Sequence, residues 1–326
     1  MSKNSKNDGS YKYMYLTTAA ICVVVTVMLV FFVIALTKFA NTDKTENSEP
    51  ESSAVSETSA EETSEVSEET SEPSRYVYFD LIEKDDCVFR NSDVLNGTLA
   101  VIDGTLGYPQ VNDEDIVRIS SVKTPQVYGL SNTSLLLNST AMTQFDRFIV
   151  SFYSQIPSNG LIISRGYTTP DAAGSDPKLI ELTTSYSLKF GIYNSSFKFS
   201  DSEFSYLKDQ CYKYGIICRY PEGKESYTGQ DADSTVYRYV GLAHSSYMNY
   251  YGYSLEEYID KLRTEKVIEY PSELEDNVTY VIYYVSADSG DTTSVPIPSD
   301  PQRYQYDISG DGTNGFIVTV RVATGA

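Results

Sequence analysis

The sequence of 326 residues predicts an α+β domain that follows a membrane-spanning helix and an acidic linker. Three observations lead to this fold class. Residues 15–37 contain no charged side chain. Residues 41–74 repeat Ser, Glu and Thr and contain no aromatic residue. From Arg75 onward, helical and strand periodicities alternate along a chain of ordinary globular composition.

The uncharged stretch is long enough to cross a bilayer. At about 1.5 Å per residue it spans roughly 34 Å, against a hydrocarbon core of ~30 Å. A signal-peptide core runs only ~7–15 residues, so we expect a retained transmembrane helix rather than a cleaved leader or a buried core helix. Lys3, Lys6 and Lys12 precede it. The positive-inside rule then places residues 1–14 in the cytoplasm and the remainder outside the plasma membrane.

The linker, residues 38–75, is predicted to be a disordered stalk. Its segment 41–74 carries eleven acidic residues and one lysine, which is half of the formal net charge of −20. Such a composition cannot bury enough apolar surface to fold, and its like charges extend it. The acidic balance also disfavours nucleic acid as a partner, because there is no basic stripe to contact phosphates.

Histidine and cysteine content restricts the chemistry. His244 is the single histidine, so one copy of the chain cannot build a metal site from two or three histidines. Cys22 lies in the expected span, which leaves Cys87, Cys211 and Cys218 outside. The odd number leaves one thiol unpaired or pairs it between chains. At least two of the three are expected to be small buried hydrophobes.

Three helices are predicted in the outer part. Residues 139–153 carry apolar side chains at helical spacing. Residues 202–214 form a helix that Gly215 terminates. Ser254-Leu-Glu-Glu257 is a capping box that opens a helix to about residue 262.

Strands are predicted between and after these helices. The clearest is 183–193, where large apolar residues alternate with polar ones. After Pro271 the pattern is all strand, and the glycine-rich segment 310–315 indicates a hairpin, with a calcium loop as the weaker alternative. The predicted strands are 99–103, 117–119, 160–164, 183–193, 216–220, 236–240, 278–285, 304–308 and 316–322.

Six short segments carry a resemblance to a known family. They are Tyr214-Gly215, Arg219-Tyr220-Pro221, Gly223-Lys224-Glu225, Thr228-Gly229, Tyr237-Arg238-Tyr239-Val240-Gly241 and Leu255-Glu256-Glu257-Tyr258. In order and spacing they resemble zinc D-alanyl-D-alanine carboxypeptidases of the VanY type, and the likeness covers roughly residues 98–262. It implies a LAS-type D,D-carboxypeptidase-like core, with a mixed antiparallel sheet and helices, over residues 76–265. Residues 266–326 would then form a C-terminal β extension.

The resemblance implies a zinc site that this sequence does not keep. The family holds zinc through His and Asp of an HxTGxAxD motif and through a second His of ExWH, whose Glu is the general base. The first motif aligns with residues 182–189, so that Leu182 replaces the His and Lys189 the Asp. In the second, Asp233 replaces the Glu and Val236 the His. The sequence therefore predicts no zinc, no other cofactor and no catalytic residues.

The same alignment suggests which residues line the former pocket. Three interpretations of them stay open: drift in an unused pocket, a remodelled pocket in which Lys189 meets a carboxylate, or a Lys189–Asp233 ion pair in place of the metal. The ion pair is favoured over ligand capture. The candidates are Arg165, Tyr167, Thr168, Thr184, Lys189, Asp233 and Tyr237, with Thr168 at the position of the family's substrate-binding arginine.

The resulting functional hypothesis is a membrane-anchored, extracytoplasmic pseudoenzyme of a Gram-positive bacterium. It would be a non-catalytic module that binds a cell-wall peptide or regulates wall metabolism, with a peptidoglycan stem peptide or a wall-associated protein as its partner. One alternative is an active carboxypeptidase with an unusual metal site built from Cys or Asp. Another is a structural scaffold for a second membrane protein.

Overall fold

The computed structural model describes residues 76–157, 160–193, 198–199 and 202–324, which belong to one compact unit, Thr70–Ala326. The expected transmembrane helix at 15–37 and the stalk at 38–75 lie outside these residues. No helix in the described part of the chain is long and apolar enough to span a membrane.

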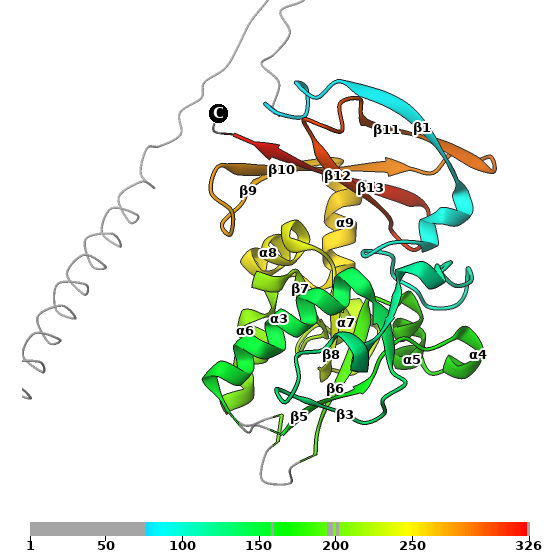
Figure 1. Ribbon diagram of the computed structural model, residues 1–326. Helices are drawn as coiled ribbons and strands as arrows, with labels where there is room; N and C mark the ends of the chain where they lie inside the picture. Colours follow the sequence, from blue (N-terminus) through cyan, green and yellow to red (C-terminus); the bar gives the residue numbers. More distant parts are fainter. Residues whose placement is uncertain (1–75, 158–159, 194–197, 200–201, 325–326) are drawn as a thin grey trace, which may run out of the picture. The chain divides into compact units, whose positions relative to one another are not determined.

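A five-stranded sheet organises the first half of the described chain (Figure 1). Its order is β3-β5-β6-β8-β7, and neighbouring strands are antiparallel except for the β3–β5 pair. The strands are β3 Gly129–Leu130, β5 Leu161–Arg165, β6 Ser187–Ile192, β7 Ile216–Tyr220 and β8 Asp233–Tyr239. A separate pair joins β2 Ile116–Arg118 to β4 Leu136–Asn138.

Helix α3, Ser139–Gln155, packs on one face of this sheet. The Asn138 side chain caps it by accepting hydrogen bonds from the amides of Thr140 and Ala141. The apolar face predicted from the sequence is buried against the sheet, which confirms this helix. Its buried residues are Ala141, Met142, Phe145, Phe148, Ile149 and Phe152.

Shorter helices complete the part of the fold built on this sheet, and the segments at 202–214 add Leu207 and Cys211 to the cluster that α3 forms with the sheet. The predicted helix at 202–214 is present as three consecutive segments, and Gly215 ends it with φ of +75°, as expected for a glycine cap. The segments are η4 Ser202–Phe204, α6 Ser205–Gln210 and η5 Cys211–Tyr214. The remaining short helices are η1 Asn91–Leu95, η2 Asp113–Asp115, α2 Ile119–Val122, α4 Pro170–Ala173, α5 Pro177–Glu181, η3 Leu182–Thr184 and α7 Glu225–Thr228.

Two helices connect this part to a second sheet (Figure 1). Helix α8, Leu242–Tyr251, was not predicted, whereas α9, Leu255–Glu265, begins at the expected Ser254–Glu257 capping box. Their apolar side chains share a buried cluster with the second sheet. Leu255, Tyr258, Ile259 and Leu262 are the buried residues of α9.

The second sheet has the order β12-β13-β10-β9 and is antiparallel throughout. Its strands are β9 Val267–Pro271, β10 Val278–Ser286, β12 Gln305–Gly310 and β13 Gly315–Ala323. The β12–β13 pair confirms the predicted hairpin. Asp311 serves that turn, since its Oδ1 accepts the amides of Thr313, Asn314 and Gly315 while Arg263 binds Oδ2 at 2.7 Å.

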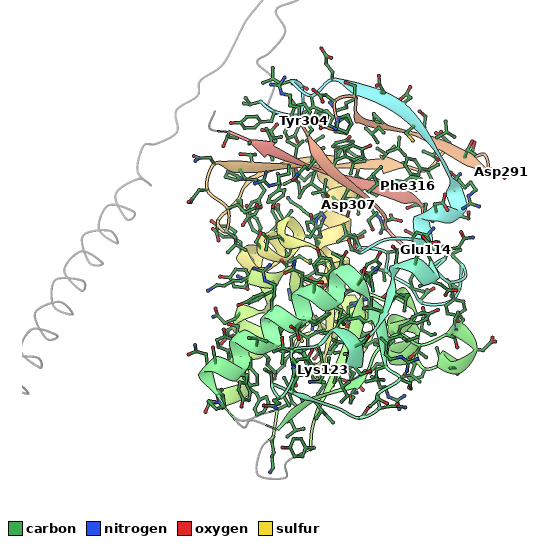
Figure 2. All side chains as sticks on the ribbon, viewed as in Figure 1. Glu114, Lys123, Asp291, Tyr304, Asp307 and Phe316 are labelled. Atoms are coloured by element: carbon green, nitrogen blue, oxygen red, sulfur yellow. The ribbon has the colours of Figure 1, made fainter. Side chains whose placement is uncertain are left out.

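The N-terminal end of the described chain packs with this second part of the fold, although the core domain was expected to begin at residue 76. Strand β1, Lys84–Arg90, pairs with β11, Thr292–Pro298, over seven residues of each strand. Behind this pair lies an apolar cluster that includes Phe316 and Tyr304, both labelled in Figure 2. The boundary expected at residue 265 therefore lies between the two sheets. It does not divide the chain into two contiguous domains, because β1 precedes it and pairs with β11, which follows it.

The strand predicted at 99–103 does not form. Leu99 and Ala100 are fully buried, but their segment joins no strand ladder. The Leu99 amide donates instead to Ser309 Oγ at 2.9 Å, and the carbonyls of Thr98 and Ala100 accept from Arg238. Side chains thus bond to the backbone of residues 98–100, and the Val101 amide donates to the Asp311 carbonyl outside any strand ladder, which explains why an apolar run that resembles a strand is not one.

Candidate functional site

Strands β6 and β8 bring the aligned positions together. They are antiparallel neighbours in which Lys189 lies opposite Val236 and Ser187 lies opposite Arg238. Because side chains alternate along a strand, these four point to one face of the sheet, away from helix α3. Leu182 begins the 3₁₀ turn that leads into β6.

The backbone supports the alignment of residues 182–189 with the HxTGxAxD motif. Ser185 falls where that motif has glycine, and its φ is +63°. A left-handed conformation is uncommon for a residue other than glycine, so this turn keeps the geometry that a glycine would favour. Thr184, the one motif residue retained, bonds through Oγ1 to the Glu181 carbonyl at 2.9 Å and is buried.

Lys189 forms the predicted ion pair with Asp233. Lys189 Nζ lies 3.0 Å from Asp233 Oδ2, and a second cation, Lys178 Nζ, lies 3.3 Å from the same oxygen. Asp233 Oδ1 accepts hydrogen bonds from the amide and hydroxyl of Thr235. Partial burial alone would raise the pKa of Asp233, but Thr235 and Lys189 hold this pKa at about 2. The carboxylate is thus ionised and fully occupied.

Lys178, the second cation of this cluster, was not among the predicted site residues. It lies on α5, whose first residue is Pro177 and whose cap is the Asp176 side chain. Lys178 precedes Leu182 by four residues, so the two share a helical face. That spacing was the available signal.

A salt-bridge network, buried beneath this cluster, fixes its elements. Glu181 binds Arg238 and Arg219, each at 3.0 Å, and Arg219 also binds Glu256 at 2.6 Å. Burial would raise the pKa of Glu181, but Arg238 and Arg219 together hold it below its ordinary value. Two acids and two arginines balance in charge, which makes their burial tolerable. The network ties α5 to β7, β8 and α9.

The residues aligned with the metal ligands of the VanY-type family do not fit zinc. Leu182 and Val236 are each 1% exposed and offer only aliphatic carbon. Lys189 presents an ammonium where the resemblance implies a carboxylate, and zinc ligands must be imidazole, thiolate or carboxylate. Within the described ranges, no group of three or more His, Cys, Asp and Glu side chains could hold a metal ion.

His244 and the cysteines lie elsewhere. His244 Nδ1 contacts the Tyr258 hydroxyl at 2.7 Å and Nε2 contacts Thr319 Oγ1 at 3.0 Å, while burial lowers its pKa to about 3. The cysteines of the described chain are free. Burial raises the pKa of Cys218 to about 11, which keeps the thiol protonated and a poor metal ligand.

The other residues predicted to line the pocket, namely Arg165, Thr168 and Tyr167, have different surroundings. Arg165 lies opposite Lys189 in the β5–β6 pair and is exposed, so it adds positive charge beside the cluster. Thr168 is close to Leu182, whose carbonyl accepts its amide at 3.3 Å. Tyr167 is half-buried and its amide bonds to the Leu136 carbonyl.

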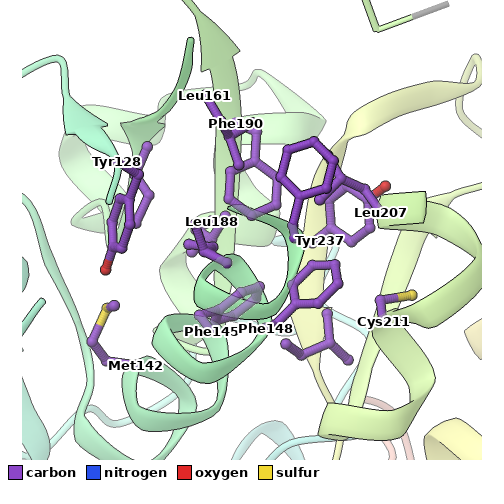
Figure 3. Packing of buried hydrophobic residues seen from close by; sticks show 14 of the residues in the cluster. Tyr128, Met142, Phe145, Phe148, Leu161, Leu188, Phe190, Leu207, Cys211 and Tyr237 are labelled. Carbon is purple, nitrogen blue, oxygen red and sulfur yellow. The ribbon is translucent and has the colours of Figure 1, made fainter. Parts of the chain in front are cut away.

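Tyr237 was wrongly placed in the pocket. It is 1% exposed and points to the α3 face of the sheet, opposite to Val236. Its ring lies 5.3 Å from that of Phe190 and 6.3 Å from that of Phe148, and Figure 3 shows the three rings together in the core. The error came from treating an adjacent motif residue as a pocket residue although strand alternation reverses its side chain.

Known proteins resemble parts of this chain. It is 38% identical over 118 residues to a D-alanyl-D-alanine carboxypeptidase of Enterococcus faecium, matching 36% of each chain. It is 45% identical over 53 residues to the bifunctional D-Ala-D-Ala dipeptidase and carboxypeptidase VanXYC of Enterococcus gallinarum, or 16% of this chain and 28% of that one. The chain thus spans about a third of the length of these relatives. No protein-family model matches.

A solved structure shares the fold. The D,D-dipeptidase VanXYg, crystallised with a D-Ala-D-Ala phosphinate analogue, matches with a TM-score of 0.58 at 20% identity. The match covers 73% of this chain and 99% of that one. The homologues and structural neighbours of this chain are therefore D-Ala-D-Ala carboxypeptidases of the VanY and VanX type, which the chain resembles in part of its sequence and in its fold.

Proposed function

We propose that this chain is a non-hydrolytic relative of the D,D-carboxypeptidases that binds the carboxyl end of a cell-wall peptide. The observation that carries the proposal is the cluster in which Lys189 and Lys178 share Asp233 Oδ2 at 3.0 and 3.3 Å. The ion pair holds two strands and a helix around one carboxylate. In a metal site, the metal and its ligands would have this role.

The metal ligands and the general base that zinc-dependent hydrolysis requires are missing at this position. Zinc-bound water needs three protein ligands and an open position, and two of the three aligned positions are buried aliphatic residues. A general base also needs a pKa near the working pH. Asp233, with a pKa of about 2 and both oxygens engaged, is too weak a base and has no free lone pair directed at water.

Peptide binding follows from the excess charge. Two lysines share one carboxylate, which leaves one positive charge, and the exposed Arg165 lies on the adjacent strand. The lysine side chains are 28% and 35% exposed, so an incoming anion can reach them. A peptide C-terminal carboxylate would supply the missing negative charge. We propose a peptidoglycan stem peptide as that ligand.

The proposal includes anchorage at the plasma membrane through residues 15–37, with the outer domain held on the stalk. Its support is the uncharged stretch alone. Carbonate washing of membranes that contain the full chain should leave it in the pellet. A variant lacking residues 1–40 should be released by the same wash, and its retention would contradict the anchor.

The first experiment measures zinc and turnover. We expect the full chain, purified in mild detergent, to contain far less than one zinc per molecule. We also expect it to release no D-alanine from a D-Ala-D-Ala-terminated pentapeptide. About one zinc per chain, or steady D-alanine release, would overturn the non-hydrolytic assignment.

A rebuilding experiment tests the position of the site. Restoring only Leu182→His and Val236→His should give no activity, because Lys189 still opposes a dication. Adding Lys189→Asp and Asp233→Glu should produce zinc binding, since three ligands then converge. D-alanine release by the double variant alone would show that Lys189 is not at the metal position.

A binding experiment tests the ligand. The same pentapeptide should bind the full chain in calorimetry, and its C-terminal amide should bind at least about tenfold more weakly, because the amide lacks the charge. Lys189→Gln should reduce the affinity similarly, whereas Lys213→Gln, an exposed lysine on η5, should not. Equal affinity for acid and amide would refute carboxylate recognition even if hydrolysis is absent.

A further inference from the structure

A second candidate site is a cavity of about 550 Å³ on other elements of the fold. Its lining comes mainly from the end of β8, the beginning of α8, and strands β12 and β13. We name it the acidic cavity after its two carboxylates, Asp115 on η2 and Asp307 on β12, the second of which is labelled in Figure 2. It shares no lining residue with the Lys189–Asp233 cluster.

Neither carboxylate of the acidic cavity has a cationic partner. Within the described ranges, no lysine or arginine forms a salt bridge with Asp115 or Asp307. Asp115 accepts one hydrogen bond, from Asn112 Nδ2 at 3.2 Å. Solvent reaches Asp307, yet the protein around it removes enough water to raise the pKa of its carboxyl. A cation bound here would replace the missing hydration of a charge that the fold does not balance.

Aromatic side chains surround these carboxylates. Burial raises the pKa of the Tyr186 hydroxyl, and the charges of Asp307 and Asp115 raise it further, which places this hydroxyl near both acids. Burial and Asp307 also raise the pKa of Tyr239, whose amide donates to the Tyr186 carbonyl at 2.9 Å. Aromatic faces next to carboxylates attract an organic cation that also has apolar surface. The tyrosines of the lining are Tyr186, Tyr239, Tyr280 and Tyr306.

The basic groups of the lining do not offset this acidity. Arg321 binds Glu275 through Nε and Nη2, each at 3.1 Å, and Glu275 also accepts the Tyr280 hydroxyl. The charge of Arg321 is therefore balanced by a carboxylate outside the lining. His244 is neutral at pH 7, because burial lowers its pKa to about 3. The two aspartates thus set the charge of the cavity, which favours a cation and disfavours a phosphate or a carboxylate.

A buried hydrogen-bond donor also belongs to the lining. Asn138 is 7% exposed, and its Oδ1 accepts the amides of Thr140 and Ala141 as the cap of α3. Its Nδ2 donates to no group in the described part of the chain. A buried donor without a partner costs stability, so an acceptor from a ligand would recover that cost. An amide carbonyl is such an acceptor, whereas a simple amine or a metal ion has none.

We propose that the acidic cavity binds the lysine side chain of a peptide. The ammonium would donate to Asp307 and Asp115, the aliphatic stem would pack on the tyrosine rings, and a peptide carbonyl would accept from Asn138 Nδ2. A primary ammonium has three donors for these oxygens, whereas a quaternary ammonium such as choline has none. A metal ion fits poorly, because no group of three or more His, Cys, Asp and Glu side chains gathers within the described residues.

The cavity also has room for the peptide on either side of the lysine. A neighbouring cavity of about 440 Å³ shares Asp115, Asn138 and Tyr186 with it. The two cavities therefore meet at the residues that would hold the ligand, and the chain of a bound peptide can continue from one into the other.

The first test compares two ligands on the full chain in mild detergent by titration calorimetry. Nα-acetyl-lysine methylamide should bind. Nα-acetyl-norleucine methylamide, which keeps the four-carbon chain but lacks the ammonium, should bind at least about tenfold more weakly. Equal affinity for the two, absence of binding by both, or tighter binding of choline than of the lysine compound would overturn the proposal.

Three substitutions locate the ammonium. Asp307→Asn and Asp115→Asn should each weaken binding of the lysine compound by about tenfold, because each removes a charged acceptor. Glu114→Gln is the matched control, since Glu114 is an exposed acid on the same 3₁₀ turn as Asp115 and does not line the cavity. It removes the same charge and should bind as the parent does. Weakening by Glu114→Gln equal to that by Asp307→Asn would reduce the effect to general attraction and refute the site.

Asn138→Asp tests whether the ligand is a peptide. An aspartate keeps the oxygen that caps α3, so the melting temperature should change little, but it removes the Nδ2 donor. The variant should lose affinity for Nα-acetyl-lysine methylamide relative to pentylamine, which has the ammonium and the aliphatic chain but no carbonyl. An unchanged ratio of the two affinities would contradict recognition of the peptide carbonyl and would leave a simple amine as the ligand.

None of these outcomes depends on the lysine cluster. Lys189→Gln should leave the affinity for Nα-acetyl-lysine methylamide unchanged, and Asp307→Asn should leave the preference for the acid over the amide form of the pentapeptide unchanged. Failure of the acidic cavity to bind lysine would therefore be distinguishable from failure of the carboxylate site under Proposed function.

Discussion

Replacing Asp233 by Asn tests the electrostatics of the candidate site directly. The substitution keeps the shape and an oxygen that can accept from Thr235, but it removes the charge that Lys178 and Lys189 share. A fall in pKa from 3.8 to about 2 corresponds to roughly 2 kcal/mol of stability at neutral pH. Part of this comes from Thr235, and the lysines are partly exposed, so we expect a loss of about 1–2 kcal/mol.

The direction of the pKa shift determines how the stability difference changes with pH. The folded-state pKa of Asp233 is depressed, so its contribution is fully present above about pH 4 and disappears as the pH falls towards 2. Urea unfolding followed by far-UV circular dichroism should therefore show the parent more stable than the variant at pH 7. The difference should shrink below pH 4, as the carboxylate in the parent becomes protonated.

The control is Asp231→Asn, an exposed aspartate two residues away, which should change stability by no more than about 0.5 kcal/mol. Equal stability of the parent and Asp233→Asn at pH 7 would refute the ion cluster. A difference that persists undiminished at pH 2.5 would show that the effect is not electrostatic.

Three further predictions concern the supporting structure. Glu181→Gln should lower the free energy of unfolding by about 3–5 kcal/mol in urea denaturation, because it leaves two buried arginines without their shared carboxylate; a loss below about 1 kcal/mol would contradict the network. NMR of the single imidazole should find His244 neutral at pH 5, because burial lowers its pKa to about 3. The unfolded chain binds the same proton at a higher pH, so the free energy of unfolding should fall as the pH drops below about 6.5. Gly215→Ala should lower the melting temperature more than Gly223→Ala does. Both glycines have positive φ, but only at Gly215 would a Cβ meet a ring atom at 2.8 Å. Equal decreases in melting temperature would argue against that close approach.

The sequence allowed the longest helices and the central strands of the first sheet to be predicted because their signals are local. Helix α3 has its apolar stripe, α9 has its capping box, and β6 has its alternation. The pairing of β1 with β11 could not be predicted, since the two strands are far apart in sequence and neither has a hairpin turn that specifies the other. The strand predicted at 99–103 does not form because the hydrogen-bond partners of this segment, the side chains of Ser309 and Arg238 and the carbonyl of Asp311, come from distant residues that make no ladder with it.

The candidate site was predictable in composition but not in full geometry. The motif spacing identified Lys189, Asp233 and Val236, and it led to the ion pair that the structure contains. Lys178 was missed because it lies outside the motif and reaches Asp233 across 55 residues of sequence.

The pairing of β1 with β11 has a consequence for biosynthesis. Translation produces Lys84–Arg90 about 200 residues before Thr292–Pro298, so at roughly 5–20 residues per second the first strand waits some 10–40 s for its partner. During that time it is an unpaired edge that could associate with other chains. Its sequence, KDDCVFR, places two acidic and two basic side chains among three uncharged ones, which discourages such association. A ribosome that stalls before residue 292 would release a chain whose first strand has no partner, and we expect such truncated products to aggregate or to be degraded.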